Sequence, residues 1–131
     1  MSSAAEDPAR PFRTHTHSRV INDVRYIWDV YKLWELAKDL PVISVEVASF
    51  KELDLDCWFC GKKAPTIRRV ADHCRRIAKA DLEVPIILDA DGSLMDGGHR
   101  LAKALMLGNT TIKAVRFPVQ PPPERTEPIQ S

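Results

Sequence analysis

The sequence predicts an α/β (α+β) fold in which a small mixed β-sheet is flanked by about three helices. Segments with the alternating or wholly apolar pattern of strands are interleaved with segments whose apolar residues recur at helical spacing. Glycine, proline and Asp-Gly signals separate these segments. The chain has 131 residues, of which 44% are hydrophobic, and this is enough to form one modest hydrophobic core. We expect one domain over residues 20–117, a flexible tail over residues 1–19 and a proline-rich tail over residues 118–131.

Composition narrows the classes of function. The formal net charge of +1 provides no overall field that would attract DNA or a membrane surface. No apolar run is long enough to span a bilayer, and the N-terminal residues lack the core of a signal peptide. Three cysteines, an odd number, fit a reducing compartment better than a disulfide framework. We therefore expect a cytoplasmic protein without a membrane partner.

The first two elements are expected to be a helix and a strand. Asn22 or Asp23 is placed to cap a helix over residues 24–40, whose apolar residues recur with a period of about 3.6. Trp28 lies outside this apolar stripe, so it forms either the shoulder of the stripe or a second contact surface, such as the seam of a homodimer. Residues 42–50 alternate Val and Ile with polar residues, which is typical of a strand.

A second helix is predicted to begin at the N-cap Thr66 and to end near Ala80. Arg69, His73 and Arg76 follow one another along one of its faces. Three interpretations remain open: a solvated basic surface, a row of groups that holds the phosphates or base of a nucleotide, or a weak non-specific contact with the DNA backbone. The residues expected on the buried face are Ile67, Val70, Ala71, Cys74, Ile77 and Ala78.

The pair Cys57 and Cys60 is the most ambiguous feature of the chain. A Cys-x-x-Cys pair binds zinc when two further ligands are at hand, and His73 follows at a spacing near that of zinc fingers. The fourth ligand is missing at the expected place. We therefore interpret the cysteines as small, buried or half-buried residues, with Trp58 and Phe59 covering the core.

The rest of the domain is organised around residues 96–100, Asp-Gly-Gly-His-Arg. This segment follows a buried strand over residues 85–89, an Asp-Gly turn and a short strand, and it leads into a helix over residues 101–107. The buried side of that helix is expected to carry Leu101, Ala104 and Leu105. Gly108 is its expected left-handed C-cap, and residues 110–117 form a closing strand.

The glycines of this segment let the backbone approach a ligand closely. If Asp96 is the N-cap of the helix, the amides of Gly97, Gly98 and His99 are unpaired donors of its first turn. Together with the helix dipole and Arg100 they would form an anion site. The alternative is a simple strand-to-helix turn, with Arg100 as a surface charge.

Residues 85–117, PIILDADGSLMDGGHRLAKALMLGNTTIKAVRF, resemble the core of the ParB/sulfiredoxin-like superfamily (the ParB N-terminal-like domain). From residue 41 onward the order of elements also fits. The resemblance implies a small nucleotide-binding domain whose motif-bearing helix receives the phosphates of a nucleotide di- or triphosphate, such as ATP or CTP, with Mg²⁺. By the resemblance to sulfiredoxins, the preceding helix contributes nucleotide contacts, for which Arg69, His73 and Arg76 are the candidates.

The motif also limits the chemistry. Gly98 stands where sulfiredoxins carry the catalytic cysteine, so this chain is not expected to be a sulfiredoxin. ParB-type CTPases often carry Glu there, and the nearest substitute is Asp96, which could bind Mg²⁺ or accept a proton. Asp96 and His99 are thus the candidate catalytic residues of a slow NTPase or phosphotransferase, with the phosphates held by Gly97, Gly98, His99 and Arg100.

Three hypotheses follow. The first is the nucleotide-binding domain, with or without turnover. The second is a DNA-associated accessory protein of the partition type, which binds through the basic helix but lacks a helix-turn-helix region after residue 117. The third is a catalytically inactive protein-interaction module, which docks through Trp28 or through the loop that carries Trp58 and Phe59.

Overall fold

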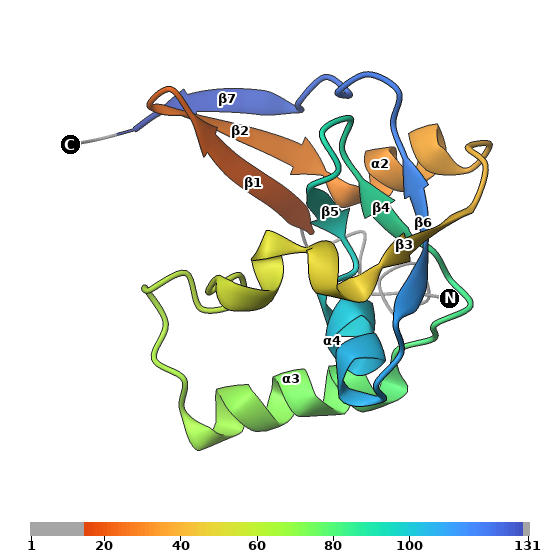
Figure 1. Cartoon of the computed structure of the whole chain (residues 1–131). Helices are drawn as coiled ribbons and strands as arrows, with labels where there is room; N and C mark the ends of the chain where they lie inside the picture. The colour runs from red at the N-terminus through yellow and green to blue at the C-terminus, as the bar shows by residue number, and fades with distance from the viewer. Residues whose placement is uncertain (1–14, 130–131) are drawn as a thin grey trace.

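A computed structural model describes residues 15–129, which fold into two β-sheets and three α-helices (Figure 1). The prediction of a small α+β fold is confirmed. The elements are β1 (Thr16–Ile21), β2 (Val24–Asp29), α2 (Val30–Ala37), β3 (Ile43–Glu46), the 3₁₀ segments η2 (Val47–Ser49) and η3 (Lys51–Asp54), α3 (Ile67–Lys79), β4 (Ile86–Leu88), β5 (Leu94–Asp96), α4 (Gly98–Met106), β6 (Thr111–Arg116) and β7 (Arg125–Pro128).

The four-stranded sheet has the order β3-β6-β4-β5 and is mixed, because β6 is parallel to β4 and antiparallel to β3. Both faces are buried at β4, whose three residues are all buried. Alternation along β4 directs Ile86 and Leu88 to the cluster formed with α4, and Ile87 to the cluster that contains Trp28 and α2. Leu101 and Ala104 of α4 therefore pack on one face of the sheet, and Leu33 and Ala37 of α2 pack on the other.

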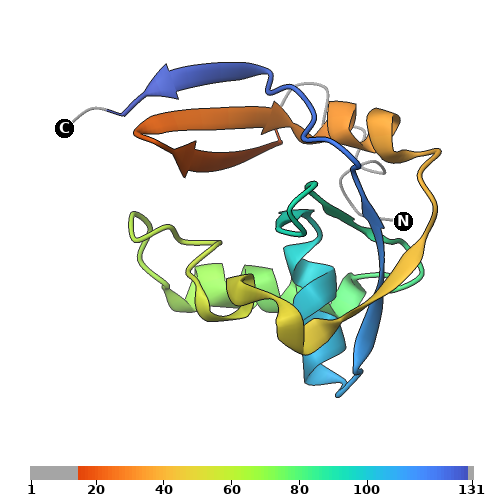
Figure 2. The ribbon, with the colours of Figure 1, turned by 45° about the horizontal axis from the view of Figure 1, so that its top comes forward.

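A second sheet, with the order β1-β2-β7, lies on the opposite side of the molecule from α3 (Figure 2). Arg19 on β1 ties it to the β4–β5 turn by donating hydrogen bonds to the carboxylate of Asp89 and the hydroxyl of Ser93. Asp89 is only 1% exposed and also accepts from Gln120 Nε2 at 2.9 Å. This buried polar contact fixes the hairpin β1–β2 above the turn that precedes the motif.

The helix predicted over residues 24–40 is wrong in its first part, because the chain forms β2 up to Asp29 and only then α2. Asn22 and Asp23 have φ angles of 51° and 65°, so they form the tight turn of the hairpin β1–β2 instead of a helix cap. The actual N-cap is Asp29, which accepts from Tyr31 N at 3.0 Å. Trp28 is 1% exposed, and this burial excludes the proposed docking role for it.

The two segments expected to be tails take part in the second sheet. β1 begins at Thr16, within the expected N-terminal tail, and β7 pairs with β2 in the proline-rich segment. Pro128 is the last residue of β7, which is an edge strand, so its missing N–H is tolerated there. Trp28 Nε1 also donates to the carbonyl of Pro121 at 2.9 Å. Residues 1–14 and 130–131 lie outside the described part of the chain.

Helix α3 begins as predicted, with Thr66 Oγ1 accepting from Arg69 N at 3.2 Å. Its predicted buried face is wrong, because Ile77 is the only buried residue of the helix and Ile67 is 91% exposed. The contacts of α3 with α4 involve its C-terminal half, where Lys103 Nζ donates to the carbonyls of Ala78 and Ala80, so nothing described covers the first turns.

Two smaller expectations also need correction. β3 ends at Glu46 and is followed by η2, so the strand predicted over residues 42–50 is shorter than expected. Leu105, expected on the buried side of its helix, is 51% exposed. Across residues 15–129 no helix combines the length and the apolar composition needed to cross a bilayer.

Candidate functional site

The motif places two glycines at the junction between β5 and α4. Gly97 is the N-cap of α4 with φ of 120°, and a Cβ on it would lie 2.4 Å from Ile86 Cγ2. Only glycine fits this position without strain. No side chain caps α4, so the amides of its first turn remain donors without an intrahelical partner. The expectation that Asp96 caps the helix is therefore wrong.

Asp96 instead ends β5 and is held from two sides. Its Oδ2 accepts from Trp34 Nε1 at 2.7 Å and from Arg100 Nη2 at 3.0 Å. Its Oδ1 lies 4.0 Å from Nε2 of His15. One carboxylate oxygen is thus committed to the protein, and Oδ1 is the oxygen that a metal ion or a proton could use.

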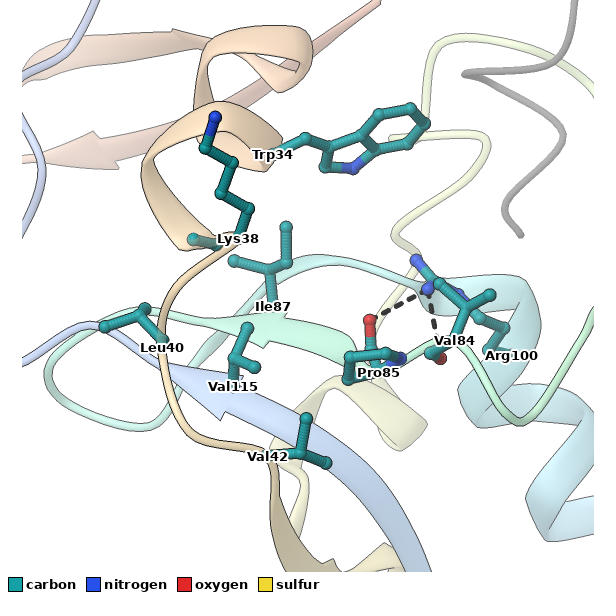
Figure 3. A pocket seen from close by; sticks show the side chains of 10 residues that line it. Trp34, Lys38, Leu40, Val42, Val84, Pro85, Ile87, Arg100 and Val115 are labelled. Atoms are coloured by element: carbon teal, nitrogen blue, oxygen red, sulfur yellow. Dashed lines mark hydrogen bonds between the residues drawn. The ribbon is translucent and has the colours of Figure 1, made fainter.

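Arg100 is directed into the protein. It is 4% exposed, and its Nη1 donates to the carbonyls of Pro85 at 2.9 Å and Val84 at 3.2 Å (Figure 3). With the ion pair to Asp96, these bonds fasten the start of α4 to the segment that enters β4. The geometry makes Arg100 a positioning residue, because both Nη1 and Nη2 donate to protein groups.

His73 from α3 and His99 from α4 meet beside the first turn. His73 Nδ1 lies 2.8 Å from His99 Nε2, within hydrogen-bond distance. The indole of Trp58 stacks on both imidazoles, with ring centroids 4.6 Å from His73 and 4.8 Å from His99. Phe59 contacts the edge of the same pair, 5.2 Å from His73. Four rings from three segments of the chain thus form one cluster.

The position of Trp58 also explains why the second glycine of the motif, Gly98, has little room for a side chain. A Cβ on Gly98 would lie 3.2 Å from Trp58 Nε1, so the indole lies across the start of α4. Sequence reasoning missed Trp58 as a site residue and assigned it to the core. The available signal was an aromatic pair in a polar, lysine-containing loop, a setting in which a large ring needs a partner surface.

The histidine pair is neutral near pH 7. Burial is the main cause that lowers the pKa of His99 to about 4, and the neighbouring His73 and Arg76 lower it further. Burial and then the charge of Arg76 lower the pKa of His73 as well. In a neutral pair one imidazole donates the shared hydrogen bond and the other accepts it. The pair therefore offers hydrogen bonding, and positive charge at the site comes from Arg76 and Lys63.

Of the row predicted on α3, the structure brings His73 to the motif and turns Arg69 away. Arg69 Nη1 donates to the carbonyl of Ala64 at 3.1 Å, back toward the loop before the helix. Arg76 is exposed, and its charge acts on both histidines. Lys63 in the loop adds a further cation that acts on His73.

Cys57 and Cys60 are exposed, so the expectation that they fill the core is wrong. Asp56 shapes their turn by accepting from the amides of Phe59 and Gly61, each at 2.8 Å. Within residues 15–129 no group of three or more His, Cys, Asp or Glu side chains is arranged to hold a metal ion. Zinc binding by this pair thus has no support from the geometry.

Comparisons of the chain with protein-family models, with curated proteins and with solved structures found no match. The elements expected over residues 85–117 are all present: β4, a turn, β5, α4, the left-handed Gly108 and β6.

Proposed function

We propose that the protein binds the phosphate groups of a nucleotide at the first turn of α4. The observation that carries this proposal is the meeting of an uncapped helix N-terminus with the His73–His99 pair and the ring of Trp58. Each of the three is common in structural roles. Together they provide backbone donors, one imidazole N–H donor and a stacking surface within one cluster.

A phosphate at this turn accepts hydrogen bonds from the first-turn amides and lies at the positive end of the helix dipole. Gly98 has no side chain that would hold the ligand away from the backbone. Arg76 and Lys63 supply positive charge, which the neutral histidines lack. Arg100 contributes indirectly, because it holds Asp96 and the segment before β4 in place.

Trp58 gives the proposed site a way to accommodate a base. Its indole now stacks on the two imidazoles. A nucleotide would exchange this stack for one between the indole and its base, and base–aromatic stacking contributes roughly 1–3 kcal/mol. Because Trp58 lies in a loop outside helices and strands, it can move without unfolding the sheet.

Asp96 is the candidate for Mg²⁺ in this proposal. Arg100 and Trp34 hold Oδ2, which leaves Oδ1 as a single oxygen ligand. Mg²⁺ is usually bound by one or two carboxylates together with substrate phosphates and water. We therefore propose that Mg²⁺ arrives with the nucleotide, and that Asp96 and His99 are the candidate catalytic groups for slow phosphoryl transfer.

A thermal-shift panel of ATP, ADP, CTP and GTP with Mg²⁺ tests the proposal. A nucleotide at a hundredfold excess over its dissociation constant should stabilise the protein by about 2.7 kcal/mol. Arg76→Ala and His99→Ala should reduce this shift. Arg100→Ala is unsuitable as a site variant, because its buried bonds support the fold.

Arg75→Ala is the matched control. Arg75 lies beside Arg76 on α3 and pairs with Asp72 at 2.9 Å, and its charge is not among those that shift the pKa of either histidine. The control should keep the full nucleotide-dependent shift. The proposal fails if no nucleotide shifts the melting temperature, or if Arg76→Ala and His99→Ala respond like Arg75→Ala.

Weak, non-specific DNA binding through α3 is a second candidate. One observation favours it: the helix is exposed over nearly its whole length and carries Arg68, Arg69, Arg75, Arg76 and Lys79. Phosphate neutralisation by such residues makes affinity fall steeply with salt. A titration of duplex DNA at several salt concentrations tests this candidate, and salt-independent or undetectable binding would exclude it.

A further inference from the structure

A cavity of about 190 Å³ lies between α2 and the four-stranded sheet (Figure 3). Ile87 of β4 and Val115 of β6 line it from the sheet, and Trp34 of α2 and Lys38, the C-cap of that helix, line it from the other side. The histidine cluster lies at the start of α4, which packs on the other face of this sheet. The cavity is therefore a second candidate binding site, on the α2 side of the sheet, and Arg100 is the lining residue that it shares with the first turn of α4.

The shape and lining of the cavity fit a small apolar ligand. Ile87 and Val115 are each 4% exposed, while Val42 at the edge is 56% exposed, so the cavity has a buried floor and an open side. Small-molecule sites typically combine such apolar walls with a few polar groups. An apolar cavity of about 150 Å³ holds benzene. This one therefore has room for a single ring or a short branched chain.

The charged residues that line the cavity favour an anionic ligand. Two cations, Lys38 and Arg100, line the cavity, and no acidic residue does. Arg100 is already bonded to two carbonyls and to Asp96. The amine of Lys38 is the adaptable cation, because its partner Glu35 is 3.4 Å away and both side chains are exposed. Such an exposed pair is weak.

We infer that this cavity binds a small monocarboxylate with an apolar body, such as an aryl-substituted acid. The apolar body lies against Ile87, Val115 and Trp34, where it is removed from water. The carboxylate stays at the open side and pairs with Lys38, so it keeps part of its hydration. A charge buried without such a partner would be strongly disfavoured.

The test uses two probes with the same ring, phenylacetate and the neutral phenylacetamide. Each is titrated into the full-length protein while the indole N–H resonance of Trp34 is followed by NMR, because that group donates to Asp96 beside the cavity. Both probes should shift this resonance in a saturable way. Phenylacetate should bind about threefold more tightly, as expected for one exposed ion pair.

Two variants at exposed positions test separately the ion pair with Lys38 and the entry of the ligand past Val42. Lys38→Glu should reverse the preference, so that the amide binds more tightly than the acid. Val42→Phe should block the open side and abolish the shift with both probes. The inference is overturned if neither probe gives a saturable shift, if Val42→Phe leaves the shift intact, or if Lys38→Glu leaves the preference for the acid unchanged. The nucleotide proposal is tested with other variants, Arg76→Ala and His99→Ala, neither of which lines the cavity.

Discussion

His73 Nδ1 and His99 Nε2 lie 2.8 Å apart and join α3 to the first turn of α4. The bond links the exposed basic helix to the motif at a point covered by Trp58. Because burial holds both imidazoles neutral near pH 7, this junction is sensitive to acidification.

Acidification should destabilise the protein through this pair. Burial is the largest cause that lowers the pKa of His99 from 6.5 to about 4. Between pH 6.5 and pH 4 the unfolded chain therefore binds a proton at this residue, whereas the native state does not. The stability contributed by the neutral imidazole is complete above pH 6.5 and is lost as the pH falls toward 4. Each such group contributes a slope of at most about 1.4 kcal/mol per pH unit. Urea unfolding at several pH values between 4 and 8 measures the free energy of unfolding and hence this slope.

His99→Gln supplies the comparison for this experiment. Glutamine keeps a polar group but does not titrate. The variant should be less stable at pH 8 than the wild type, and its stability should fall less between pH 6.5 and pH 4. Equal pH slopes in the two proteins would contradict the assignment of a lowered pKa to His99.

Gly97→Ala and Gly98→Ala should differ sharply. At Gly97 the new Cβ meets Ile86 Cγ2 at 2.4 Å and φ is 120°, so strain and overpacking should cost at least about 2 kcal/mol. At Gly98 the Cβ meets Trp58 Nε1 at 3.2 Å, and the loop can give way. Its effect should stay within about 1 kcal/mol while the tryptophan fluorescence changes. Equal destabilisation by denaturant titration would contradict this distinction.

Arg100→Ala should destabilise the fold strongly. It leaves Asp96 without its ion-pair partner and the carbonyls of Val84 and Pro85 without a donor. Removing one partner of a buried pair costs roughly 3–5 kcal/mol. Arg75→Ala, which breaks an exposed pair on α3, should cost no more than about 1 kcal/mol. Similar melting temperatures for the two variants would show that Arg100 is not a positioning residue.

Removal of residues 118–131 should lower the melting temperature. β2 would lose its partner β7, and the buried indole of Trp28 would lose the carbonyl of Pro121 as its acceptor. A buried donor left unpaired costs roughly 1–3 kcal/mol. An unchanged melting temperature would mean that this segment behaves as the free tail that its proline content suggests.

The sequence was most informative where its signals are local. The Thr66 cap, the turn before β5, the positive φ of Gly108 and the pattern of β6 were predicted correctly. The prediction of a helix over residues 24–40 was wrong in its first part, because Asn22 and Asp23 suit both a helix cap and a hairpin turn. The deciding partner, β7, lies about a hundred residues further along the chain.

The candidate site was predicted in part. The motif and the preceding helix were expected to share a site, and His73 and His99 do meet. The burial of Arg100 was not predictable, because two of its acceptors are backbone carbonyls, which carry no sequence signal. The stacking of Trp58 was missed because it depends on the path of a loop with no regular pattern.

The central claim is that phosphate binds at the first turn of α4, and the backbone amides of that turn report it most directly. In ¹H–¹⁵N NMR spectra titrated with ATP or CTP and Mg²⁺, the amide signals of Gly98 and His99 should move, together with the indole N–H of Trp58. Gly108, just beyond the other end of α4, serves as the internal reference. Unchanged signals from Gly98 and His99 at millimolar nucleotide, or shifts confined to other parts of the chain, would contradict the proposed function.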